Sequence, residues 1–190
     1  MRNLLCEPLP DAVTAAGQEY PVCTDFRDWI RFAGLLGSKE LTNTEKLQTA
    51  WLWFLEPPSV FSEELLRALI GFYRGAAPQP EESDPEEPTI PRPPTFDWTV
   101  DAGYVLGDFR RFYGMDLLRI EYLHWWEFRA LFEALPDDSC VMKRIAYRGA
   151  DLSQIKNESE RRRVARIQRM LALPFTYDDE MIGAVLWEES

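Results

Sequence analysis

A proline-dense stretch divides the chain near its middle. Seven of the 14 prolines fall in residues 76–96, together with five acidic residues and a single arginine. Proline lacks a backbone hydrogen-bond donor and fixes φ, so neither a helix nor a sheet strand can continue through such a stretch. The sequence therefore predicts a flexible or polyproline-like loop at 76–96 that separates two structured parts. The alternative role for this loop is to bind a partner domain that recognises proline-rich segments.

The N-terminal part, residues 1–75, is predicted to hold a β-hairpin and three helices. The hairpin covers residues 11–22, where Gly17 supplies the positive φ of a tight turn. The first helix follows Thr24 or Asp25, and its apolar residues recur at helical spacing. A second helix carries the apolar positions up to residue 54, and a third begins at Ser62 and ends near Arg74.

The C-terminal part, residues 97–190, is predicted to be entirely helical. The expected elements are a helix capped by Asp97, a helix within 120–135, one that runs to about residue 149, a short turn at 151–155, a long helix from Asn157 and a terminal helix at 181–187. The predicted fold is thus all-α, a bundle of about seven helices with a short N-terminal β-hairpin. We expect residues 1–75 and 97–190 to pack together as one domain.

The overall charge limits the classes of partner. Lys and Arg number 21 against 32 Asp and Glu, which gives a net charge of −11. Such an acidic chain is not attracted as a whole to nucleic acid or to anionic lipid. There is also no apolar run of about 18 residues for a membrane span, and no secretory signal. These features predict a cytoplasmic protein that binds neither membranes nor nucleic acid.

Residues able to perform catalysis or to bind a metal are few. The single histidine, His124, lies among apolar residues, where a packing role is the preferred interpretation. Cys140 could pair with it as a nucleophile, but Pro136 interrupts the chain between them and no glycine-rich loop accompanies either. Three scattered cysteines and one histidine give no metal-ligand spacing. We therefore expect no enzyme activity, no catalytic residues, no metal and no cofactor.

A basic segment contrasts with the acidic remainder. Residues 143–169 contain nine basic and three acidic side chains, a net charge of +6, which leaves −17 for the rest of the chain. On the long predicted helix Arg162, Arg166 and Arg169 cluster opposite the apolar face. This arrangement indicates either a solvated outer face or a basic stripe that binds an acidic surface, on a second copy or on a partner.

Three blocks of residues carry a family resemblance. They are Thr24-Asp25-Phe26-Arg27-Asp28-Trp29-Ile30-Arg31-Phe32, the aromatic block from Ile120 through Tyr122-Leu123-His124-Trp125-Trp126 to Phe132, and Tyr147-Arg148 followed by Asp151 to Lys156. In this order they resemble a bacteriophage family from the tail-morphogenesis region of long-tailed phages and prophages of Gram-positive hosts. The resemblance extends from Leu4 to about Pro174 and matches the proline-rich loop least.

The resemblance implies a role in assembly without catalysis. Members are usually encoded between the tail-tube and tape-measure proteins, the position of tail assembly chaperones. The implied partners are the tape-measure protein and the tail-tube protein, with self-association as a further expectation. The predicted partner-binding residues are Trp29, Trp125, Trp126, Phe128 and Arg129, with Arg162, Arg166 and Arg169 on the basic helix. For the first five, a role in the core is the preferred interpretation.

The sequence is also consistent with two other functions. One is a structural or tail-completion component of the virion. The other is a host-directed inhibitor that uses its acidic surface to imitate DNA, although the +6 segment argues against a uniformly acidic mimic.

Overall fold

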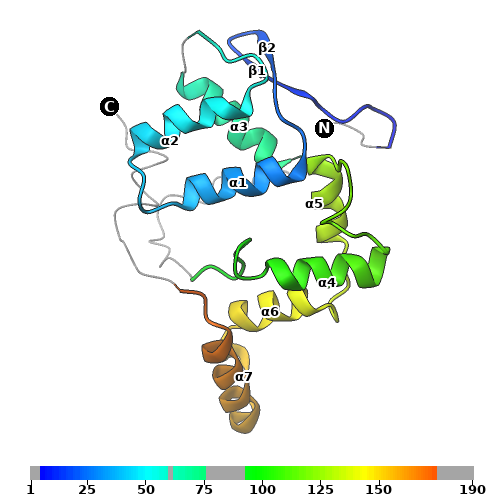
Figure 1. The fold of residues 1–190 in the computed structure, drawn as a ribbon. Helices are drawn as coiled ribbons and strands as arrows, with labels where there is room; N and C mark the ends of the chain where they lie inside the picture. Colours follow the sequence, from blue (N-terminus) through cyan, green and yellow to red (C-terminus); the bar gives the residue numbers. More distant parts are fainter. Residues whose placement is uncertain (1–4, 60–61, 76–92, 175–190) are drawn as a thin grey trace. The chain divides into compact units, whose positions relative to one another are not determined.

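The computed structural model describes residues 5–59, 62–75 and 93–174. Within these ranges the chain is mostly helical with an N-terminal hairpin, as the sequence predicts (Figure 1). Most of the predicted 76–96 loop and the whole predicted helix at 181–187 lie outside the described residues. The elements are β1 Ala12–Ala15, β2 Gln18–Pro21, α1 Phe26–Gly37, α2 Asn43–Ala50, η1 Trp51–Trp53, α3 Glu63–Arg74, α4 Ala102–Tyr113, α5 Trp125–Glu133, α6 Cys140–Gly149, η2 Leu152–Gln154 and α7 Glu158–Leu171.

The chain divides into two compact units. The first unit comprises Met1–Glu87 with Ile120–Ala134, and the second comprises Pro88–Arg119 with Leu135–Ser190. Helix α5 therefore belongs with the N-terminal elements, whereas the sequence placed it within a C-terminal part at 97–190. The chain therefore passes between the units more than once along its length.

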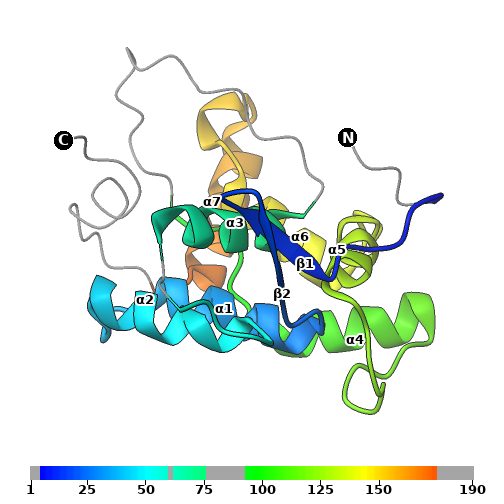
Figure 2. The same ribbon diagram turned by 90° about the horizontal axis from the view of Figure 1, so that it is seen from above.

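The hairpin packs against α3 in the first unit. Strands β1 and β2 are antiparallel, with Val13 opposite Tyr20, and β1 lies beside α3 (Figure 2). The two turn residues, Ala16 and Gly17, have φ of 50° and 75°. Both values are positive, as a two-residue hairpin turn requires, and they confirm the expected role of Gly17. The Ala16 amide donates to a carboxylate oxygen of Glu64 at 2.5 Å, which ties the turn to the first turn of α3.

The helix starts of the first unit follow local capping signals. Asp25 caps α1 and Ser62 caps α3, and each accepts a hydrogen bond from a backbone amide of the first turn. Helix α2 begins with a capping box formed by Thr42 and Glu45. It ends earlier than predicted, because a 3₁₀ turn follows it and Phe54 is extended and pairs with Val22.

The second unit contains α4, α6 and α7. Asp97 does not cap α4 directly, because its carboxylate accepts the amides of Thr99 and Val100 in a preceding turn, and α4 begins at Ala102. Asn157 caps α7, as the sequence indicates, and Ser139 caps α6, where the sequence offers Asp137, Asp138 or Ser139. Helix α6 packs on both α4 and α7.

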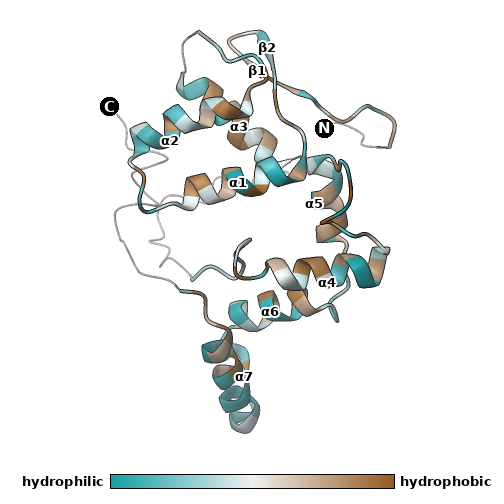
Figure 3. Cartoon of the chain, in the orientation of Figure 1, coloured by the Kyte–Doolittle hydropathy of each residue, from teal (hydrophilic) through white to brown (hydrophobic). Residues whose placement is uncertain are grey.

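Hydropathy differs among the helices of Figure 3. Apolar residues colour parts of α1, α3 and α5, whereas α7 is largely hydrophilic and buries only Val164. Each helix in the described part of the chain is too short or too polar to serve as a membrane-spanning segment.

Candidate functional site

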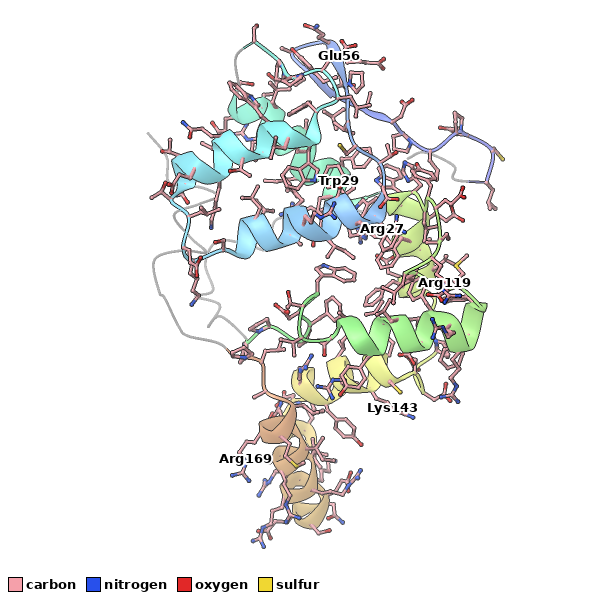
Figure 4. The ribbon with its side chains drawn as sticks, in the orientation of Figure 1. Arg27, Trp29, Glu56, Arg119, Lys143 and Arg169 are labelled. Atoms are coloured by element: carbon pink, nitrogen blue, oxygen red, sulfur yellow. The ribbon has the colours of Figure 1, made fainter. Side chains whose placement is uncertain are left out.

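The predicted aromatic residues of the first unit lie in its core. Trp29, Trp125 and Phe128 are 0%, 1% and 0% exposed. The Trp29 ring stacks on Phe72 of α3 at 4.6 Å, and Phe128 stacks on Phe26 of α1 at 4.7 Å. In Figure 4 the labelled Trp29 lies between α1 and α3. These rings join three helices that are distant in sequence.

Three predicted residues on α5 hold the C-terminal end of α3. The indole N–H of Trp125 donates to the Tyr73 carbonyl at 2.8 Å, and that of Trp126 donates to the Phe72 carbonyl at 2.9 Å. Arg129 adds a bond to the Tyr73 carbonyl at 3.1 Å. The last carbonyls of a helix have no partner within it, so these side chains satisfy groups that would otherwise need water. A cation is also favoured near this negative end of the helix dipole.

Gly75 allows Arg129 to approach the end of α3. Its φ of 71° and ψ of −159° fall in a region that only glycine adopts readily. A Cβ atom at this position would lie 3.0 Å from Nη1 of Arg129. The guanidinium of Arg129 also pairs with Glu133 at 2.6 Å.

The structure therefore gives the predicted aromatic residues a role in folding. Their rings and indole N–H groups are engaged within the first unit, and only Trp126 and Arg129 are partly exposed. Partner contact through Trp29, Trp125, Trp126, Phe128 or Arg129 stays a prediction.

His124 has a specific role that the sequence did not indicate. It is the N-cap of α5: its Nδ1 accepts the Trp126 amide at 3.0 Å, and its Nε2 lies 2.9 Å from the Pro10 carbonyl. Nδ1 must be unprotonated to accept, so the neutral ring carries its proton on Nε2 and donates it to Pro10. Burial lowers the pKa of His124 below its usual 6.5, although the Pro10 bond and the charges of Glu127 and Asp11 act in the opposite direction.

Exposed apolar side chains concentrate at α2 and η1. Leu47 and Trp51 are 37% and 36% exposed, and Leu52 and Leu55 are 73% and 64% exposed. Four large apolar residues within nine positions form the most apolar exposed run of the first unit's described surface. We call these four residues the Leu47–Leu55 run. Leu47 and Trp51 are among the apolar positions of the predicted second helix, and periodicity alone does not show whether such a face is covered.

The predicted basic residues lie on the outer face of α7 in the second unit. Arg162, Arg166 and Arg169 are all exposed, on the side of the helix opposite Val164. Arg162 pairs with Glu158, one turn earlier. Figure 4 shows the labelled Arg169 projecting from the side of α7. The structure thus brings the three arginines together on one face.

A buried ion pair anchors α7 in this unit. Asp101 is 0% exposed, and Arg148 donates to its two carboxylate oxygens at 2.5 and 3.0 Å. Arg148 also donates to the carbonyls of Thr95 and Leu171, at 3.0 and 2.7 Å. One guanidinium therefore joins α4, the segment before it, α6 and the end of α7.

The remaining chemistry of the described residues is limited. No group of three or more potential ligands among them could hold a metal ion. Cys23 is half-buried, and burial is the main cause that raises the pKa of its thiol.

Comparison with known proteins places the chain in a family. No curated protein and no solved structure matches it. The family described as "Bacteriophage Gp15 protein" matches residues 5–173, a range that includes all the elements described above. The chain therefore belongs to the bacteriophage Gp15 protein family.

Proposed function

We propose that this protein is a tail assembly chaperone or tail-assembly factor that acts in the host cytoplasm without catalysis. It would bind apolar helical segments of the tape-measure protein and release them when tail-tube subunits assemble. The observation that carries the proposal is membership of the bacteriophage Gp15 family over residues 5–173. The resemblance of the chain to a family from the tail-morphogenesis region of phages supplies the rest of the argument.

The Leu47–Leu55 run supports binding of an apolar partner. Because Trp29, Trp125 and Phe128 are buried, a partner helix needs another apolar surface. Leu52 and Leu55 are exposed and can contribute apolar area without unfolding of the first unit. A short run gives weak and reversible contact, which suits a partner that tube subunits must displace.

Co-expression tests this proposal. The tape-measure protein encoded by the same phage would be produced alone, with the wild-type chain and with the variant Leu52→Gln/Leu55→Gln. We expect the wild type to raise the soluble fraction of the tape-measure protein severalfold and the variant to lose most of this effect. The control Val100→Gln/Leu118→Gln removes exposed apolar side chains from the second unit, and it should behave as the wild type does.

Two results would contradict the chaperone proposal. One is a tape-measure protein whose solubility does not depend on the wild-type chain. The other is the presence of this protein in stoichiometric amounts in purified particles by mass spectrometry, which would favour a structural or tail-completion role.

A further inference from the structure

The outer face of α7 has the geometry of a binding surface. Arg162, Arg166 and Arg169 follow one another at spacings of four and three residues, so they form a row along one side of the helix. Met170 lies four residues after Arg166 and is 77% exposed. We call Arg162, Arg166, Arg169 and Met170 the basic stripe. Val164, the buried contact of α7, lies on the opposite side.

The row of like charges is only partly compensated. Glu158 pairs with Arg162, but no carboxylate in the described part of the chain forms an ion pair with Arg166 or Arg169. Like charges four residues apart destabilise a helix by a few tenths of a kcal/mol. A purely solvated face gains nothing from this arrangement, whereas a surface that meets opposite charges does.

Charge is also segregated between the units. The described residues of the second unit carry 12 basic and nine acidic side chains, while those of the first unit carry seven basic and 13 acidic ones. Over its full bounds the second unit carries 13 basic and 14 acidic side chains, whereas the first unit carries 8 basic and 18 acidic ones, so nearly all of the net charge of −11 lies in the first unit. A negatively charged partner would therefore meet less repulsion at the second unit, where the basic stripe lies.

We propose that the basic stripe binds an acidic amphipathic helix of a partner protein, with carboxylates on one face at spacings of four and three residues and an apolar side chain beside them. Carboxylates at that spacing repeat at the same intervals as Arg162, Arg166 and Arg169, because both helices have the same rise per residue. Met170 would contact the apolar side chain. A phosphate backbone offers no such apolar contact, and the acidic remainder of the chain opposes nucleic acid.

This surface is distinct from the Leu47–Leu55 run, which lies in the first unit. The inference therefore does not depend on binding of the tape-measure protein. It predicts a second class of partner, acidic instead of apolar.

Fluorescence anisotropy with the full-length chain tests the inference. The probe is a labelled alanine-based helical peptide with three glutamates and one leucine on one face. A second peptide has the same composition with the glutamates distributed around the helix. We expect the one-faced peptide to bind about tenfold more tightly than the distributed one, and both to weaken as salt is added.

Two triple variants locate the binding surface. Arg162→Gln/Arg166→Gln/Arg169→Gln should weaken binding of the one-faced peptide about tenfold. The control Arg31→Gln/Arg67→Gln/Arg119→Gln changes the net charge by the same amount, at exposed arginines outside the stripe, and should leave binding within about twofold. Met170→Gln keeps every charge and should weaken binding about threefold. Circular dichroism checks that each variant keeps the helical content of the wild type.

Three results would overturn the inference. Equal weakening by both triple variants would show that only net charge matters. Equal affinity of the wild type for the two peptides would show that the spacing of the arginines does not determine binding. This comparison requires no variant of the protein. Stripe-dependent binding of a DNA duplex that is tighter than binding of the one-faced peptide would assign the surface to nucleic acid.

Discussion

Replacing Arg148 with methionine should strongly destabilise the second unit. The side chain of Arg148 is 3% exposed and donates two hydrogen bonds to Asp101, one to the Thr95 carbonyl and one to the Leu171 carbonyl. Methionine fills similar volume but leaves a buried carboxylate without its main partner. Breaking a buried ion pair in this way costs about 3–5 kcal/mol of unfolding free energy.

Urea denaturation near neutral pH, followed by circular dichroism, measures this loss. Amide hydrogen exchange of peptides from α4 and α6 shows whether the loss falls in the second unit. Arg144→Met is the matched control, because Arg144 is 20% exposed at its side chain and donates a single bond to Asp101 at 3.2 Å. It should cost about 1 kcal/mol.

The pH dependence provides a further check. Burial raises the pKa of Asp101, but the bonds from Arg148, the Asp97 amide and Arg144 outweigh it and hold the pKa below the usual 3.8. The Asp101–Arg148 pair therefore contributes its full stabilisation to the unfolding free energy above pH 3.8, and this stabilisation is lost as the pH falls below 3.8. Wild type and Arg148→Met should converge in stability in strong acid. The reasoning is refuted if Arg148→Met costs no more than Arg144→Met near neutral pH.

Four further substitutions, at three positions, test other parts of the structure. His124→Ala should cost about 2 kcal/mol, from the lost α5 cap and the lost bond to Pro10, by urea denaturation. In the wild type, the unfolding free energy should fall as the pH drops below about 6.5, because the unfolded chain binds a proton that the folded ring of His124 resists. His124→Asn should keep the cap and remove this pH dependence. An unchanged pH profile would contradict the assigned ring state. Gly75→Ala should cost about 1–3 kcal/mol in thermal or urea unfolding, since its backbone conformation suits glycine alone and the new methyl group meets Arg129; a neutral effect would argue against this conformation. Asp108→Ala should cost about 2 kcal/mol, since the buried carboxylate accepts two amides at the start of α6, and faster exchange of those amides is the specific readout.

Several elements were predictable because their signals are local. The structure confirms Ser62 and Asn157 as caps, and it selects Asp25 over Thr24 and Ser139 over Asp137 and Asp138; each acts on an amide within three residues of its own position. Gly17 marks the hairpin turn for the same reason. The exposure of the arginines on α7 also followed from helical spacing, since they lie opposite the apolar face of the same helix.

The candidate site was less predictable, because burial depends on distant segments. The pattern around Trp125 identified an apolar helix face, but not that its indole would meet the end of α3, 52 residues away. Trp51 has a similar apolar character and is 36% exposed, since no other segment covers it fully.

By itself the sequence determined the helical composition, the hairpin, caps such as Ser62 and Asn157, and the row of arginines on α7, all of which arise from interactions between residues a few positions apart. Only the tertiary structure decided that α5 belongs to the first unit, that His124 caps a helix and that Asp101 and Arg148 form a buried pair 47 residues apart. Such long-range pairs are selected by shape and by the satisfaction of buried polar groups, and neither leaves a periodic signal in the chain.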